Sequence, residues 1–298
     1  MEPPMLNRLH EILLGHRTDV RARSLFLWLA LIGFGIHLGL WAGFSLGLYD
    51  LPDGMEPLFR SPLISLYTPF SILLVYEVYE LIQVLHQSFS RSMIKQFEVT
   101  ALIVVRDAIK ATADADVQVA NGSIDQDLLF LLMVKGLVFL GLLAVCWGFQ
   151  REAQRQTRVA EDQTGIETYI QFKKFIALVL FTSFVFMALK SLIEWTCSVA
   201  NGGSPELTAS IFFSDFFSLL ILADISILLL SYRFTNEFHS LARNTGFVLS
   251  TIILRLALES SGFTAPILFM TSGLIGYGVL LVTGWSMANL PAQRSQRE

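Results

Sequence analysis

Four charged side chains lie inside apolar stretches of this sequence, where an ionised group is costly to bury. Two are acids, Glu77 and Asp224, and two are arginines, Arg106 and Arg255. At the centre of a lipid bilayer an isolated ionised side chain costs from about 3 kcal/mol to well over about 10 kcal/mol. Each of these residues therefore needs a partner, water or a functional role.

The positions of these residues predict two intramembrane ion pairs. Glu77 lies about nine residues before the end of one apolar segment, and Arg106 lies about nine residues after the start of the next. At a rise of ~1.5 Å per residue, both lie about 13 Å from the same membrane surface. The same count holds for Asp224 and Arg255, so we expect each acid to meet the arginine of the following helix.

Two interpretations of these pairs are open. Buried ion pairs can keep an arginine-bearing segment inside the bilayer and fix the register of neighbouring helices. They can also mark a gated path for ions or protons. A dry, closed network around the charges favours the first interpretation, and a polar cavity that reaches a membrane surface favours the second.

Three further titratable residues are candidates for carrying a proton. Glu80 shares a helical face with Glu77, and Asp107 adjoins Arg106, so this part of the chain holds more acid than one arginine neutralises. Glu80 also lies near the cytoplasmic end of its segment, where a lysine or water is an alternative partner. His37 lies in the middle of the first apolar segment, where a neutral imidazole either packs as a hydrogen-bonded residue or relays protons.

Lysines near the predicted outer membrane surface have simpler expected roles. Lys190 and Glu194 are four residues apart on one helix and should neutralise each other. Lys135 lies close enough to the surface for its ammonium group to extend into water.

The sequence carries no recognisable catalytic or metal-binding motif. We find no His-Glu-x-x-His helix, no strand–turn–helix nucleophile elbow, no phosphate-binding glycine loop with lysine, and no paired Cys or His ligands. The sequence therefore predicts no catalytic residues, no metal and no cofactor, and the protein is not expected to be an enzyme. No basic domain lies outside the apolar segments, so nucleic-acid binding is not expected either.

The composition is typical of an integral membrane protein. Of 298 residues, 53% are hydrophobic and 15% are charged, and the mean hydropathy is +0.57. Six apolar segments approach the roughly 20 residues that a bilayer crossing needs. They are Leu25–Leu48, Leu63–Leu85, Leu128–Phe149, Phe175–Val199, Ile211–Leu230 and Pro266–Val282. Two shorter segments of about 15 residues, Phe97–Ala111 and Thr245–Leu258, each contain one of the arginines.

The distribution of charges between segments predicts eight spans with both termini in the cytoplasm. Basic and acidic loops alternate, and basic loops face the cytoplasm. The alternation closes only if both short arginine-bearing segments cross the membrane. The basic residues are Arg8, Arg17, Arg21 and Arg23, then Arg91 and Lys95, then Arg151, Arg155, Arg158, Lys173 and Lys174, then Arg233 and Arg243, and finally Arg294 and Arg297. The acidic residues are Asp50, Asp53 and Glu56, then Asp114, Asp116, Asp125 and Asp127, then Glu206.

Short patterns recur in the same order in the two halves of the chain and indicate a duplication. Phe70-Ser-x-Leu-x-x-x-Glu77 recurs as Phe217-Ser-x-Leu-x-x-x-Asp224, Ile103-x-x-Arg106 as Ile252-x-x-Arg255, and Met133-x-x-Gly-Leu as Met270-x-x-Gly-Leu. A unit of four spans keeps its orientation when it is repeated, so the repeat is parallel. The expected fold is an all-α integral membrane protein of about eight transmembrane helices, arranged as two parallel four-helix repeats.

This organisation divides the chain into five regions. We expect a cytoplasmic amphipathic segment at 1–23, a first four-helix membrane unit at 24–150, a cytoplasmic linker at 151–172, a second four-helix membrane unit at 173–287 and a cytoplasmic tail at 288–298.

The order of signals within each copy resembles a known family. The segments that carry the likeness are Leu74-Val-Tyr-Glu77-Val-Tyr-Glu-Leu-Ile82, Thr100-Ala-Leu-Ile-Val-Val-Arg106 and Ser250-Thr-Ile-Ile-Leu-Arg255-Leu. They resemble the phosphate-starvation-inducible PsiE family of four-span proteins, here as two units in tandem. The resemblance implies the fold and a bacterial inner-membrane location, but it implies no molecular activity. With no catalytic motif in the sequence, we expect a non-catalytic, stress-related protein. The alternative function is an ion- or proton-coupled transporter or channel that uses the acid–arginine pairs.

A stripe of glycines marks the first apolar segment. Gly35, Gly39, Gly43 and Gly47 recur at four-residue spacing and would allow a second helix to approach closely. We expect this stripe to face another helix, which makes a second copy of the chain or a membrane partner a candidate beside the lipid bilayer itself.

Overall fold

The computed structural model describes residues 5–49, 56–59, 61–119, 126–156, 166–200, 206–234, 238–260, 262 and 264–289. Every regular element in these ranges is helical. In chain order they are α1 (Met5–Leu14), α2 (His16–Ser45), η1 (Glu56–Phe59), η2 (Pro62–Leu66), α3 (Tyr67–Gln83), η3 (Val84–His86), α4 (Phe89–Val119), α5 (Gln126–Gln156), α6 (Ile166–Ala200), α7 (Glu206–Phe234), α8 (Phe238–Glu259) and α9 (Thr264–Asn289). The acidic residues Asp50, Asp53 and Asp125 and the end of the chain from residue 290 lie outside the described residues.

Seven helical segments in the described part of the chain are long and apolar enough to cross a bilayer. They are Met5–Ser45, Pro62–His86, Gln126–Gln154, Glu167–Glu194, Asp215–Phe234, Phe238–Glu259 and Thr264–Trp285. This number of long apolar helices, with no strand among the described residues, identifies an all-α, multi-pass membrane protein.

The two short segments that carry the arginines belong to longer helices than we predicted. Phe97–Ala111 is the apolar part of α4, which has 31 residues, and Thr245–Leu258 lies within α8, which has 22. Helix α4 is not among the seven apolar helices, because charged residues recur along its length. Its 31 residues nevertheless measure about 46 Å at ~1.5 Å each, which exceeds a hydrocarbon core of about 30 Å.

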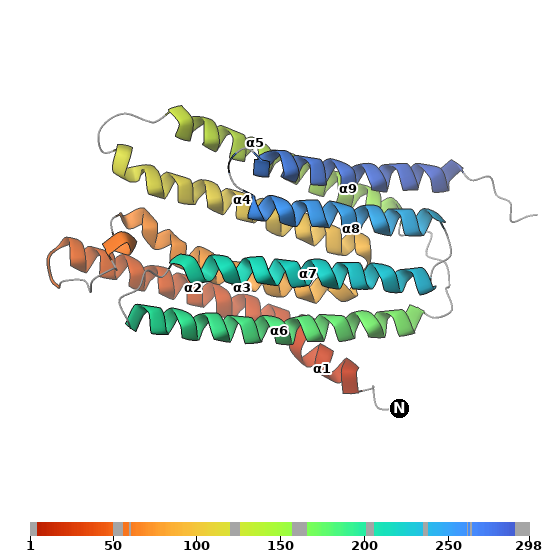
Figure 1. Cartoon of the computed structure of the whole chain (residues 1–298), viewed down its shortest axis with the longest axis horizontal. Helices are drawn as coiled ribbons and strands as arrows, with labels where there is room; N and C mark the ends of the chain where they lie inside the picture. Colours follow the sequence, from red (N-terminus) through yellow and green to blue (C-terminus); the bar gives the residue numbers. More distant parts are fainter. Residues whose placement is uncertain are drawn as a thin grey trace, which may run out of the picture.

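The helices form two series that face each other. Consecutive helices pack together from α2 to α5 and again from α6 to α9, and contacts between α4 and α8 and between α5 and α9 join the two series. Figure 1 shows both series following the same order across the molecule, with helices that run in the same alternating directions.

Two apolar cores lie between the series, and each takes helices from both halves of the chain. The first core is built mainly by α3, α6 and α7, with Leu14 of α1 at its edge and Val99 of α4 at its boundary. The second core is built by α4, α5, α8 and α9, with the rings of Phe97, Phe149 and Phe247 in contact. Where the cores meet, α3 and α7 lie against α4 and α8. We call this boundary the seam, and it is lined by Leu81, Gln96, Val99, Thr100, Ile103, Phe217, Leu254, Arg255 and Leu258.

The predicted amphipathic segment 1–23 is not one helix. Helix α1 ends at Leu14, and α2 begins at His16, so residues 16–23 form the first turns of the long apolar helix. Gly15 has an extended backbone at this break, and a Cβ atom there would lie 2.1 Å from the carbonyl oxygen of Glu11. Only glycine tolerates so close an approach of the backbone, which fixes the bend between the two helices.

Candidate functional site

The first acid–arginine pair forms as the sequence predicts, between α3 and α4. The guanidinium group of Arg106 engages both carboxylate oxygens of Glu77, with Nη1 donating to Oε2 at 2.7 Å and Nη2 to Oε1. The Glu77 side chain is 5% exposed and that of Arg106 is 13% exposed. The ring of Phe70 lies 5.8 Å from the guanidinium carbon. A bidentate pair of this kind satisfies both carboxylate oxygens inside the protein.

The second pair also forms, between α7 and α8, but with a different geometry. Nη2 of Arg255 donates to Oδ2 of Asp224 at 2.6 Å, and the hydroxyl of Thr251 donates to the same oxygen at 3.4 Å. The Arg255 side chain is 3% exposed, and its Nη1 group is buried without a hydrogen-bond partner among the described residues. This pair is therefore more buried than the first, and it leaves one guanidinium nitrogen of the arginine without an acceptor in the described part of the chain.

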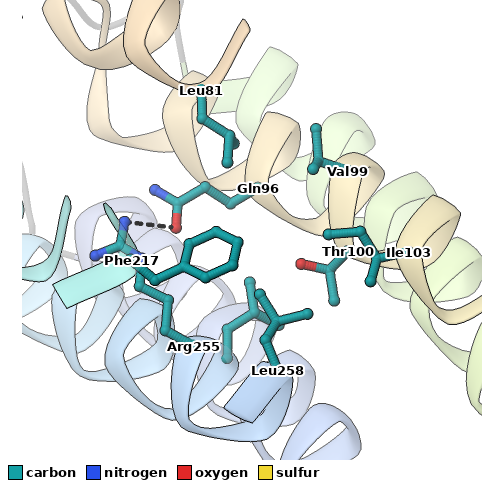
Figure 2. A pocket seen from close by; sticks show the side chains of 9 residues that line it. Leu81, Gln96, Val99, Thr100, Ile103, Phe217, Arg255 and Leu258 are labelled. Atoms are coloured by element: carbon teal, nitrogen blue, oxygen red, sulfur yellow. Dashed lines mark hydrogen bonds between the residues drawn. The ribbon is translucent and has the colours of Figure 1, made fainter. Parts of the chain in front are cut away.

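A glutamine links the second pair to the other half of the chain. The side-chain oxygen of Gln96 on α4 accepts a hydrogen bond from Nη2 of Arg255 at 3.4 Å, and the Gln96 amide donates to Ser92 at 3.4 Å. Figure 2 shows Gln96 of α4 and Arg255 of α8 meeting at the seam, with Phe217 of α7 beside them. Sequence analysis missed Gln96, although a polar residue four positions before Thr100 and one position before Phe97 on an otherwise buried face is a usable signal.

Each ion pair joins a helix of the first core to a helix of the second. Glu77 and Asp224 lie on α3 and α7, whereas Arg106 and Arg255 lie on α4 and α8. Two small cavities lie at the seam, each with room for about one water molecule, and Gln96 lines both. Both pairs therefore join the two cores. The second pair lies where the packing between the cores is incomplete, because Arg255 lines one cavity and Asp224 lines the other.

The predicted excess of acid around the first pair is neutralised by lysines. Glu80 pairs with Lys95 at 2.9 Å. The sequence had left a lysine or water as the alternative partner of Glu80. Asp107, which is exposed, pairs with Lys135 at 2.5 Å, a contact that the sequence did not predict for this lysine. Each of the two further acids therefore has a lysine partner, although Lys95 is shared with Glu98 at 3.6 Å.

The phenol of Tyr76 extends the polar contacts of Glu80 towards α2. Its hydroxyl lies 3.2 Å from Oε1 of Glu80 and 3.1 Å from Oδ1 of Asp19. Tyr76 and Asp19 were not among the candidate residues of the sequence. A tyrosine four residues before an acid on the same helix is a signal for this contact, because such residues are neighbours on the helix surface.

His37 packs with hydrogen bonds at its ring nitrogens, and its role as a proton relay stays a prediction. Its Nδ1 atom lies 2.7 Å from the hydroxyl of Thr68, and its Nε2 atom lies 3.0 Å from the carbonyl oxygen of Leu58. Its ring meets that of Phe59 edge to face, with centroids 5.1 Å apart. Both ring nitrogens are engaged, so His37 fastens α2 to η1 and to the start of α3.

The glycine stripe does not face another helix of this chain, contrary to the prediction. A Cβ atom on Gly35 or Gly39 would meet nothing within 4 Å, and one on Gly43 would meet the ring of Tyr49. Gly47 has φ of +68° and ends α2, a backbone conformation that glycine adopts without strain. The opposite face of α2 packs instead, with Gly33 close to Thr68 and Ile72.

The same stripe contains a Gly-x-Ser-x-Gly spacing, which hydrolase nucleophiles use. In the structure its serine, Ser45, is the exposed last residue of α2 and follows a helix instead of a strand. The strained strand-to-helix turn that activates such a serine is therefore missing. Among the described residues, no cluster of three or more His, Cys, Asp or Glu side chains is placed to hold a metal ion.

Comparison with models of protein families, with curated proteins and with solved structures gives no match for this chain. What the seam does therefore has to follow from its own geometry.

Proposed function

We propose that this chain is a non-catalytic, multi-pass protein of the bacterial inner membrane. Its two acid–arginine pairs fix the register of the helices of the first core against those of the second core. The observation that carries the proposal is the closure of the first pair, in which Arg106 engages both oxygens of Glu77 in a buried position. A pair closed in this way favours a structural contact, because the bidentate geometry leaves neither carboxylate oxygen free to bind a transported ion or proton. The resemblance to the PsiE family supports the same conclusion and suggests a stress-related role.

An eighth span, α4, belongs to this proposal. Three of the charges that distinguish α4 from the apolar helices are paired with neighbouring helices, since Arg106 meets Glu77, Lys95 meets Glu80 and Asp107 meets Lys135. Arg106 is largely buried as well as paired, and a paired charge that faces the bundle interior is the kind that transmembrane helices tolerate. Eight spans place both termini in the cytoplasm, as the alternation of basic and acidic loops requires.

A duplication of a four-helix unit is the second part of the proposal. The equal order and direction of the two series of helices support it (Figure 1). So does the recurrence of an acid–arginine pair between the second and third helices of each series. In this account each copy contributes half of both cores, so neither copy buries its apolar surface alone.

Flux measurements on purified protein in liposomes test the proposed function. We expect proton and ion fluxes equal to those of protein-free liposomes, both at rest and under an imposed membrane potential. The matched variant is Asp224→Asn, which keeps the shape of the side chain but removes its charge. A flux that exceeds the protein-free level and falls in Asp224→Asn would overturn the structural role.

A second candidate function, a path for protons or small ions along the seam, is favoured by one specific observation. Within the described part of the chain Nη1 of Arg255 is buried without a hydrogen-bond partner, and the two cavities beside Gln96 each have room for about one water molecule. Water in these cavities would link the second pair to its surroundings. This candidate predicts a flux that falls in both Asp224→Asn and Gln96→Leu but persists in Lys190→Leu, whose ion pair is exposed.

A further inference from the structure

Helix α1 is docked on the end of the bundle where α3 ends and α6 begins. Its last turn is fastened by two side chains of α3, because the Tyr79 hydroxyl donates to the carbonyl of Leu13 at 3.0 Å and the Gln83 amide donates to that of Leu14 at 3.1 Å. From α6, the ammonium group of Lys174 donates to the side chain of Asn7 at 3.1 Å. The two bonds from α3 satisfy backbone carbonyl groups that the end of a short helix leaves without intrahelical partners.

Two histidines meet where α1 touches the bundle. The rings of His10 on α1 and His86 in η3 pack edge to face, with centroids 4.4 Å apart. His10 is 6% exposed. Nε2 of His10 and Nδ1 of His86 are both buried and have no hydrogen-bond partner among the described residues. The contact is therefore built for two neutral rings, since each ring has a nitrogen whose proton would find no acceptor.

The groups around the two rings oppose a positive charge. His86 and Lys174 act on His10, and Lys173 and Lys174 of α6 act on His86. The carbonyl of Gln83 faces His86 and accepts at most the one N–H of a neutral ring.

Among the described residues, the charged groups that act on the two rings are all cationic. The Lys173 ammonium donates to the carbonyl of Gln87 at 2.5 Å and lies 4.8 Å from the ring centroid of Phe89 on α4. The carboxylate that acts on Lys173 is that of Asp224 on α7, which is not among the charged groups that act on either histidine. From α2, the carboxylate of Asp19 is engaged by the hydroxyl of Tyr76 on α3. Protonation of either histidine would add a cation beside two lysines, which like charges resist.

We propose that the His10–His86 contact makes the docking of α1 acid-sensitive, so that α1 is held at neutral pH and released when the two imidazoles take up protons. Release costs the four contacts described above and frees an amphipathic helix whose Met5, Leu9 and Ile12 are already exposed. Above about pH 7.5 a free imidazole is neutral, so docking is unaffected there. Docking weakens as the pH falls below about 6.5, where a released imidazole takes up its proton.

Proton linkage sets the size of the expected effect. If the docked state binds neither proton and the released state binds both with ordinary affinity, the ratio of docked to released α1 falls about 100-fold between pH 7.5 and pH 5.5. With one histidine removed, the same change of pH lowers the ratio about 10-fold, and with both removed it leaves the ratio unchanged.

Electron spin distance measurements on the whole chain test the proposal. Spin labels are attached through Glu11→Cys on α1 and Gln171→Cys on α6, two exposed positions, in a background with the exposed Cys197→Ser. We expect one narrow distance population at pH 7.5 and a second, broader one that grows as the pH falls to 5.5. Identical distance distributions at pH 7.5 and pH 5.5 would overturn the proposal. This result needs no substitution of either histidine.

Histidine variants in the same labelled protein assign the effect. His10→Gln and His86→Gln should each reduce the response from about 100-fold to about 10-fold, so the result does not depend on one variant that fails to dock. His16→Gln is the matched control, because this residue is exposed at the start of α2 and should leave the full response. A full response in the double variant His10→Gln with His86→Gln would also overturn the proposal.

Discussion

Removal of Arg106 should destabilise the protein more than removal of Arg106 and Glu77 together. In Arg106→Leu the carboxylate of Glu77 stays between α3 and α4, where the residue is 4% exposed, but it loses both guanidinium donors. It must then remain as an unpaired buried charge or take up a proton. In Arg106→Leu with Glu77→Leu, two apolar side chains replace the pair, and no charge is left behind.

The expected magnitudes follow from the burial of the pair. Breaking a buried ion pair by removing one partner typically costs about 3–5 kcal/mol, whereas its replacement by apolar residues of similar volume is often neutral or stabilising. We therefore expect Arg106→Leu to lower the free energy of unfolding by about 3 kcal/mol or more, and the double variant by less than about 1 kcal/mol. Arg106→Lys should lie between them, because one ammonium group cannot reproduce the bidentate geometry.

The free energy of unfolding can be measured by denaturant titration of the protein in bicelles, together with the yield of folded protein in membranes. Lys190→Leu is the control, because its pair with Glu194 spans 3.6 Å and the two side chains are 65% and 53% exposed. Exposed pairs contribute little, so this variant should resemble the unaltered protein. Equal losses in Arg106→Leu and in the double variant would refute the reasoning, since they would mean that the two charges do not stabilise each other.

Three further predictions test the packing, the histidine and the topology. Gly246→Ala should lower the free energy of unfolding by about 1–3 kcal/mol, because its methyl group would lie 2.6 Å from a branched side chain of α9. Gly39→Ala should cause no loss, and comparable losses for the two variants in denaturant titration would contradict the assigned helix faces. His37→Leu should cost about 1–3 kcal/mol by the same measurement, because it leaves the Thr68 hydroxyl and a carbonyl unpaired, and an unchanged stability would mean that water replaces the imidazole. A reporter fused near Asp116 should lie outside the cytoplasm if α4 crosses the membrane, and a cytoplasmic signal would leave seven spans.

The ion pairs could be predicted from the sequence because the constraint on them is severe. An arginine in an apolar segment must find an acid at the same depth, and consecutive helices offer few choices. Arg106 and Arg255 each had one candidate acid at that depth on the preceding helix, and each meets that acid in the structure. Equal depth does not determine how many hydrogen bonds a pair makes, so the difference between the two pairs was not predicted.

The environment of the glycine stripe could not be predicted, because small residues show where a helix can approach but not whether one does. Helices α6, α7 and α9 are apolar on every side, so their sequences do not indicate which face turns inward. The contact between Gln96 and Arg255 depends on how the two series of helices face each other, which no spacing along the chain encodes. For the same reason the sharing of both cores by the two halves appears only in three dimensions.

The location of the charges at the seam follows from the physics of helix packing in lipid. Between helices surrounded by lipid the hydrophobic effect contributes little, so association depends on close packing and on polar contacts. Inside each core the packing is close, as between Gly246 and Val279, where the glycine leaves no room for a Cβ atom. At the seam the cavities beside Gln96 interrupt that packing, and the contact of Arg255 with Asp224 acts there instead. The seam is therefore where a lost polar contact would let the two cores slide or separate. For this reason the charge variants are more informative about the stability of the fold than any substitution inside the cores.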